Sequence, residues 1–181
     1  METSLHNNSQ AREYITHASL AKGIGWGSIG GVIGTLVMDL ILMGVLSALG
    51  KQALSCFLIV GDTVMHFFSL LGMDMAGGVP LGIATHYIVG PVVGAIFGAA
   101  VTQVNQLRAG TLKKRVMFAV LYVEILSQPM LVMTPVLLQT STSETFVWFG
   151  GSFIMHLIWG VVLGVVLSLG LRLATAETHK R

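Results

Sequence analysis

The chain has 181 residues, of which 54% are apolar and only 10% are charged, and its formal net charge is +2. Soluble domains carry about 25% charged residues, so this composition excludes an ordinary soluble enzyme and a disordered chain. One cysteine excludes an internal disulfide, and the small net charge argues against a nucleic-acid partner. A polytopic α-helical membrane protein remains.

Four apolar runs are long enough for the roughly 20 residues that cross a bilayer. They cover residues 23–50, 79–104, 116–138 and 146–171. A polar N-terminal segment at 1–22 precedes a transmembrane helical domain at 23–172, and a short polar tail at 173–181 follows it. The sequence therefore predicts an all-α fold, an integral membrane four-helix bundle.

A shorter apolar segment at 53–73 lies between the first and second spans and carries Asp62 and His66. Its polar residues fall on one stripe of a helix, which indicates an amphipathic or re-entrant helix. The two ionisable residues are four apart and form a secondary pair. We expect them to face water if the helix lies flat, and to line an entrance to the bundle if it re-enters the membrane.

The positions of Lys and Arg predict the orientation, because cytoplasmic loops are enriched in them. Four basic residues separate the second and third spans, and three more follow the fourth span. With four spans, both termini lie on the cytoplasmic side of the cell (inner) membrane, and Lys51 alone among the basic residues lies outside. A fifth span at 53–73 is the alternative, and it would move the N-terminus outside.

Small residues recur every four positions in three of the spans, which places them on one face of each helix. Lipid gives helices no hydrophobic reason to associate, so such faces are typical of close backbone contacts between helices. We predict helix packing at Gly27, Gly31, Gly90, Gly94, Gly98, Gly160 and Gly164.

Ionisable residues stand on these same faces. A buried carboxylate needs a partner or stays protonated, so we expect Asp39 to pair with His86 or His156. The predicted buried polar layer consists of Asp39, His86, Glu124, Gln128 and His156. Three interpretations are open: a hydrogen-bond network that fixes helix register, a proton or ion path, or a metal ion held by Asp39, His86 and His156. Metal-ligand spacing is absent, so the metal ion is the weakest of the three and no other cofactor is predicted.

The second and fourth spans also resemble each other, since His86, Gly90 and Gly94 align with three residues of the same types from His156 onward. This alignment predicts two duplicated hairpins related by an axis along the membrane normal. Chance similarity between glycine-rich helices is the alternative.

Two local features complete the pattern. Ser141 and Glu144 have the spacing of a capping box ahead of the last span. Cys56 lies inside an apolar run, where a small packing residue is expected rather than a reactive thiol.

With these residues in view, the chain resembles the small YagU-like multi-pass membrane proteins of bacteria and archaea. The matching features are the glycine-rich first span that ends in Met38-Asp39-Leu40, the turn at 77–82, and the helices that contain His86 and His156-Leu-Ile-Trp-Gly160. The resemblance covers roughly residues 25–172. It implies a four-helix membrane fold and no agreed activity.

The absence of a catalytic motif argues against an enzyme acting alone. We expect a non-catalytic structural or accessory subunit of a larger membrane complex, for example a respiratory or copper-monooxygenase-type assembly. Its partners would be the lipid bilayer and other membrane subunits or a second copy of the chain. The alternative is a small proton- or ion-coupled transporter or channel that uses Asp39, His86, Glu124 and His156. Helices packed by small residues leave little lumen, so transport would require a homo-oligomer.

Overall fold

The computed structural model describes the backbone of residues 2–108 and 110–178, and the side chains of 19–105, 107 and 110–174. Every regular element in this part of the chain is a helix. The elements are α1 (Glu2–Ala48), α2 (Ser55–Leu70), α3 (Gly78–Gln103), α4 (Asn105–Arg108), α5 (Leu112–Leu137) and α6 (Thr142–Thr178). The predicted all-α class is therefore confirmed.

Four of these helices contain stretches long and apolar enough to cross a membrane, as expected of a polytopic membrane protein. The stretches are Ser19–Ala48, Gly78–Gln103, Leu112–Leu137 and Thr142–Ala174. They match the four predicted runs, and the first and last extend a few residues further at the ends that carry the termini.

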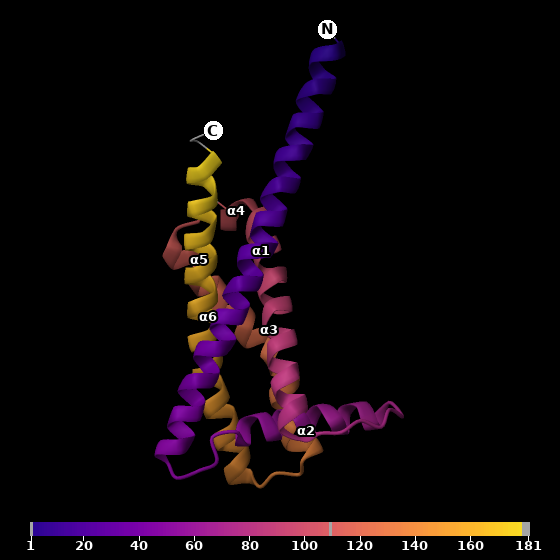
Figure 1. The fold of residues 1–181 in the computed structure, drawn as a ribbon, viewed down its shortest axis with the longest axis vertical. Coiled ribbons are helices and arrows are strands. Elements are labelled where there is room, and N and C mark those ends of the chain that lie inside the picture. The colour runs from indigo at the N-terminus through magenta and orange to yellow at the C-terminus, as the bar shows by residue number, and fades with distance from the viewer. Residues whose placement is uncertain (1, 109, 179–181) are drawn as a thin grey trace.

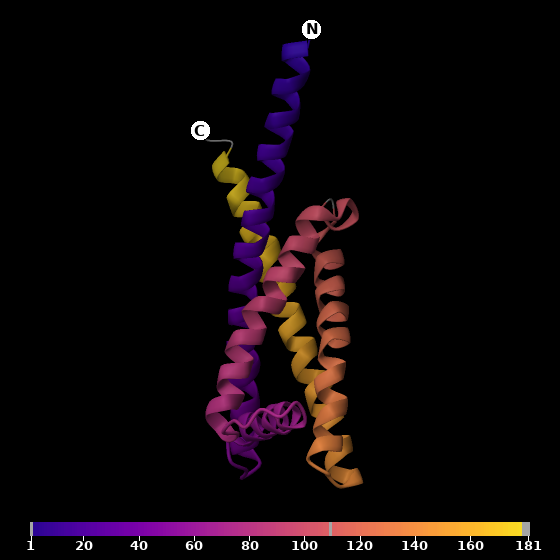
Figure 2. The same ribbon diagram turned by 90° about the vertical axis from the view of Figure 1, so that its right-hand side faces the viewer.

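The long helices run side by side and alternate in direction (Figure 1). Both chain ends lie at one end of the bundle, which we call the terminal end. The opposite end is crossed by α2, which runs transverse to the long helices in both views (Figures 1 and 2). We call it the α2 end.

Helix α1 packs against both α3 and α6, and α5 packs against α6. The glycine stripes form these contacts. A Cβ atom added to Gly27 or Gly31 would overlap the backbone carbonyl of Gly94 or Gly90, so only glycine allows this approach of α1 and α3. On α6, a Cβ atom at Gly160 would lie 2.6 Å from the Cα of Val120 in α5. The predicted packing role of these glycines agrees with this geometry.

Helices α3 and α5 make few contacts with each other. They approach near α4 and separate toward the α2 end (Figure 2). The Tyr122 hydroxyl joins them by donating a hydrogen bond of 3.0 Å to the Val93 carbonyl, and the Tyr122 ring packs on Phe97. The bundle is thus closed toward the terminal end, where the apolar core gathers: Met38, Phe97, Val101, Ala119, Val123, Trp159, Leu163 and Leu167.

Polar side chains stabilise the helix starts at the α2 end. Ser141 and Glu144 form the predicted capping box, in which the Ser141 backbone N–H donates to the Glu144 carboxylate at 2.9 Å and the Glu144 N–H donates to the Ser141 hydroxyl at 3.3 Å. Asp62 of α2 accepts a hydrogen bond of 2.8 Å from the Gly78 N–H at the start of α3. A carboxylate at this position satisfies an otherwise free N–H and complements the helix dipole.

Candidate functional site

The site begins with a contact between α1 and α3. Nδ1 of His86 donates a hydrogen bond of 2.9 Å to Oδ1 of Asp39. The Asp39 side chain is 4% exposed and the His86 side chain 15%, so the pair is almost completely removed from solvent. The stripe of small residues on α1 allows this hydrogen bond. The close contact of Gly31 with Gly90, which lies about two turns from Asp39 along α1 and one turn from His86 along α3, holds the two backbones together. The sequence prediction that Asp39 pairs with a histidine agrees with this geometry.

Beside this pair lies a half-open cavity of about 830 Å³. All five of the helices α1, α2, α3, α5 and α6 contribute to its walls. Most of the lining is aliphatic or aromatic, and the polar groups are few. Exposed residues at the α2 end mark its mouth: Lys51 and Gln52 in the segment between α1 and α2, and Glu144 in the first turn of α6. A cavity of this size inside one chain was not expected from the sequence, which predicted little lumen.

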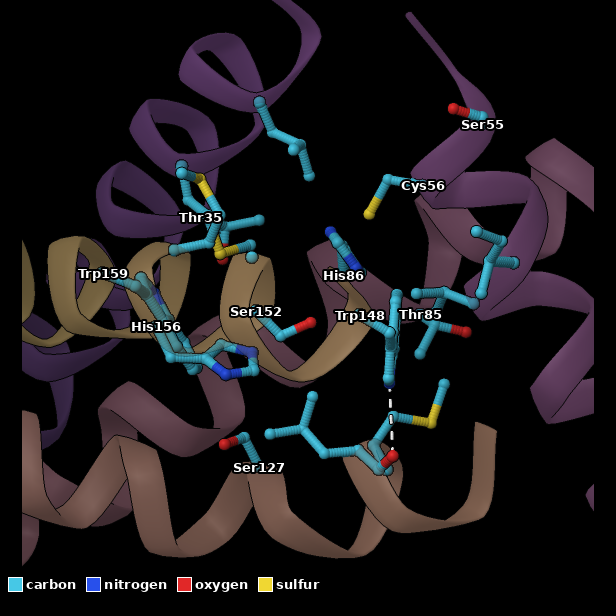
Figure 3. Close-up of a pocket in the computed structure, with 18 of the residues that line it drawn as sticks. Thr35, Ser55, Cys56, Thr85, His86, Ser127, Trp148, Ser152, His156 and Trp159 are labelled. Carbon is cyan, nitrogen blue, oxygen red and sulfur yellow. Dashed lines mark hydrogen bonds between the residues drawn. The ribbon is translucent and has the colours of Figure 1, made fainter. Parts of the chain in front are cut away.

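Two histidines face this cavity from different helices. Figure 3 shows His86 of α3 with Cys56 of α2 beside it, and His156 of α6 with Ser152 one turn before it. Both imidazoles line the same cavity. His86 has its Nδ1 bound to Asp39, so Nε2 is the nitrogen available to a solute. The Nδ1 of His156 is buried and has no hydrogen-bond partner among the described residues.

Glu124 lies behind His156, at the contact of α5 with α6. The register that pairs Gly164 with Val116 and Gly160 with Val120 places His156 level with Glu124. Both Glu124 carboxylate oxygens are buried and lack a partner among the described residues. Glu124 does not line the cavity. The structure thus holds a second carboxylate near a second imidazole, without a direct hydrogen bond between them.

Gln128 does not join this layer. Its side chain is exposed, and it donates a hydrogen bond of 3.0 Å to the Glu124 carbonyl of its own helix. A spacing of one helical turn from Glu124 does not ensure that a residue faces the cavity. Ser127 lines the cavity, whereas Gln128, the next residue, points outward.

Asp62 and His66 are adjacent, as their spacing predicts, but their side chains do not pair. His66 is exposed and bonds through Nδ1 to the backbone carbonyl of Asp62 at 2.8 Å, while the Asp62 carboxylate is committed to Gly78. The predicted secondary pair is therefore two separate interactions. Asp62 acts at the start of α3, and neither residue lines the cavity.

Two tryptophans shape the cavity, and sequence reasoning did not assign them to the site. Pro135 lacks an N–H, which leaves the Leu131 carbonyl without its partner within α5. The indole N–H of Trp148 donates to that carbonyl at 3.2 Å and fixes the ring as part of the wall (Figure 3). Trp159 donates to the Gly31 carbonyl at 3.2 Å and closes the deep end. The sequence contains a signal for the Trp148 contact: a proline inside the third span frees a carbonyl, and the next span carries a tryptophan that can donate to it.

Cys56 also lines the cavity. Burial, together with the nearby Asp39 charge, raises the pKa of its thiol to about 12. The thiol is therefore protonated at physiological pH and is a poor nucleophile. This agrees with its predicted role as a packing residue.

The metal interpretation gains no geometric support. Among the residues whose side chains are described, no three His, Cys, Asp or Glu residues are arranged to hold a metal ion. Asp39 and His86 are in contact, but His156 does not join them as a third ligand.

Comparisons of the chain with protein-family models, with characterised proteins and with solved structures give no match. The functional argument therefore rests on the geometry of this chain.

Proposed function

We propose that this chain is a proton-coupled membrane transporter that binds its solute inside a single bundle. The observation that carries the proposal is His86, which lies on the wall of the 830 Å³ cavity and is hydrogen-bonded to the buried Asp39 behind it. Intramembrane ionisable residues commonly mark proton and ion pathways, and solute sites are cavities of about this size.

The pair is suited to proton exchange because one nitrogen is held and the other is available. The Asp39 carboxylate accepts the hydrogen bond from Nδ1 and fixes the orientation of the His86 ring. Nε2 is then the position at which a proton is taken from or given to a bound solute or water. Phe57 packs edge-on against the ring with centroids 5.2 Å apart, which limits its rotation.

His156 and Glu124 extend the polar groups from the cavity toward the middle of the bundle. The Nδ1 of His156 and both carboxylate oxygens of Glu124 have no hydrogen-bond partner in the described part of the chain, and burying such groups is costly unless function requires them. A proton that reaches His156 from the cavity has Glu124 as the next acceptor on the same level. This sequence of groups, Asp39 with His86 and then His156 with Glu124, is the proposed path.

The orientation and the symmetry belong to the same proposal. Both termini lie at one end of the bundle (Figure 1), and the distribution of Lys and Arg favours the cytoplasm for that end. The cavity then opens outward, beneath an interfacial α2. The aligned glycines of α3 and α6 make equivalent contacts, Gly90 with Gly31 and Gly160 with Val120, which supports duplicated hairpins. The resemblance to the YagU-like proteins stays a proposal beside it.

An accessory role in a larger membrane complex is the second candidate. The long helices expose many large apolar side chains, among them Leu40, Ile88 and Val136. Either lipid or neighbouring subunits would cover them. Purification from the native membrane in mild detergent tests this candidate: a stoichiometric set of other subunits supports it, and a lone chain or homo-oligomer argues for a self-contained transporter.

The transport proposal is tested in vesicles that contain the purified chain and an internal pH dye. We expect an imposed membrane potential to drive proton flux through the wild type, and Asp39→Asn to abolish most of that flux. Ser168→Ala is the matched control, because Ser168 is a fully buried polar residue that does not line the cavity. Wild-type flux no faster than that of empty vesicles would contradict the proposal.

A further inference from the structure

The cavity has a second opening, in the side of the bundle between α3 and α5. Val89 of α3 and Leu126 of α5 both line the cavity, yet each is 46% exposed. The register set by the Tyr122–Val93 hydrogen bond places them level with each other across the gap. Residues that line a cavity and are also half-exposed stand at its edge.

Two contacts frame this opening. Toward the terminal end it is closed by the Tyr122–Val93 hydrogen bond and by the Tyr122 ring on Phe97, with centroids 5.1 Å apart. Toward the α2 end it is closed by Thr63 of α2, whose hydroxyl is 3.2 Å from the Thr134 hydroxyl of α5 in a buried hydrogen bond. The opening is therefore a lateral window with fixed edges rather than a general separation of helices.

The window faces hydrocarbon if the four long helices span the membrane. Val89 is eleven residues from the start of α3 at Gly78, which places it about 16 Å along the helix axis, near the middle of a membrane about 30 Å thick. Whatever enters there comes from among the lipid chains. The cavity walls beyond the window are mainly aliphatic, from Met38, Leu42, Met130 and Leu131, and would accept an apolar chain.

The polar groups of the cavity determine which polar head group such a molecule can carry. His86 lies about 12 Å along α3 from Gly78, well below the headgroup region. A phospholipid headgroup, with its phosphate and ester groups, would find few polar partners in this lining. A single carboxyl group, by contrast, has two imidazoles to bind, His86 and His156, and a hydroxyl at Ser152.

We infer that the cavity binds a long-chain carboxylic acid, which enters from the bilayer through the window between Val89 and Leu126 and places its carboxyl group between His86 and His156. The inference rests on the proposed function in so far as it names the solute of the same cavity. A carboxylic acid exchanges a proton with an imidazole, so this solute is also chemically consistent with a proton-coupled site.

The experiment uses the full chain in phosphatidylcholine vesicles and a palmitic acid analogue that carries a photoreactive diazirine in its chain. After illumination, mass spectrometry locates the modified residues. We expect adducts on cavity residues such as Met130 and Met155. Unlabelled palmitic acid should suppress them, and hexadecanol should compete at least about tenfold less well, because it lacks the charge-assisted hydrogen bonds of a carboxylate.

Window variants test the entry route. Val89→Trp with Leu126→Trp should remove the cavity adducts, because two indoles fill the gap. Val92→Trp with Ile125→Trp is the matched control on the same helices, since both residues are more than half exposed and neither lines the cavity. Cavity labelling that survives the window variant overturns the lateral entry, and equal competition by hexadecanol overturns the carboxylic acid as the solute class. Adducts confined to outward residues such as Val92 and Ile125 overturn the site altogether.

The two proposals fail separately. If the cavity is labelled but the vesicles show no proton flux, the carboxylic-acid site stands and the proposed proton transport is wrong. Flux that depends on Asp39, with no cavity labelling, keeps the proton path and removes the carboxylic acid as the solute.

Discussion

Asp39 and His86 lie 47 positions apart in the chain and 2.9 Å apart across the contact of α1 with α3. Asp39 is almost fully buried, and His86 faces a cavity that five helices line. This pair connects the glycine packing of the bundle with its proposed chemistry, because the close approach of Gly31 and Gly90 holds the two side chains within hydrogen-bond distance.

The pair should stabilise the folded bundle. We expect a double-mutant cycle of Asp39→Asn and His86→Gln, followed by unfolding in detergent, to give a coupling free energy of about 1 kcal/mol. Each single variant removes the charge-assisted bond while keeping a polar group of similar size. A coupling free energy indistinguishable from zero would show that the two side chains do not interact in the membrane protein.

The glycine contacts predict a steric effect on stability. Gly94→Leu and Gly164→Leu should each lower the unfolding temperature, since a Cβ atom would meet the Gly27 carbonyl in one case and lie 2.7 Å from the Val116 Cα in the other. Overpacking of this kind costs about 1–3 kcal/mol or more. Gly44→Leu is the control, because a Cβ atom there meets nothing within 4 Å. Equal unfolding temperatures for all three variants would show that these faces do not pack.

Much of this fold follows from the sequence. The spans are set by length and hydropathy, and the stripes at Gly90 and Gly160 identify the contact faces because spacing of four residues has one geometric meaning in a helix. The pairing of Asp39 with a histidine follows from the cost of an unpaired buried carboxylate. These are local or energetic rules that need no tertiary information.

The cavity does not follow from such rules. It arises because α3 and α5 separate toward the α2 end, and helix separation depends on crossing angles that a single sequence does not specify. For the same reason the roles of Trp148 and Ser152 became evident only with the helices in place. The exposed position of Gln128 does not follow from its spacing either, because residues four apart are offset by about 40° around a helix, and this offset turns Gln128 away from Glu124.

The hydrogen bond of Asp62 to the start of α3 predicts different effects for substitutions at Asp62 and at His66. Asp62→Ala should destabilise the chain by about 0.5–2 kcal/mol, the usual cost of losing a helix cap. His66→Ala should have little effect, because His66 is exposed and bonds only to a carbonyl of its own helix. Thermal unfolding of the two variants in the same detergent tests this. A larger loss for His66→Ala would point to the predicted side-chain pair after all.

Cys56 should react slowly with alkylating reagents. With a thiol pKa of about 12, only about one molecule in a thousand carries the thiolate at pH 9. An added cysteine in the exposed segment before α3, Ala76→Cys, is the comparison and should react at an ordinary rate. Iodoacetamide labelling of the folded chain between pH 7 and pH 9 measures both rates, and equal rates would contradict the burial of Cys56.

The orientation predicts the side from which labels reach the connecting segments. On a Cys56→Ser background, Lys51→Cys and Ala76→Cys should both react with an impermeant maleimide added outside intact cells, because both flank α2 at one end of the bundle. Lys113→Cys, near the start of α5 at the terminal end, should be protected until the membrane is opened. Reaction of Lys51→Cys with protection of Ala76→Cys would require α2 to span the membrane.

The central claim is that a cavity lined by His86 and His156 is reached from the α2 end of a single chain. The most direct measurement is the modification of single cysteines by a small, charged methanethiosulfonate, on the Cys56→Ser background. Ser152→Cys lines the cavity and Leu163→Cys lies fully buried in the core on the same helix. We predict rapid modification of Ser152→Cys from the outside and none of Leu163→Cys. If Ser152→Cys is as inert as Leu163→Cys, the cavity is not accessible and the account is wrong.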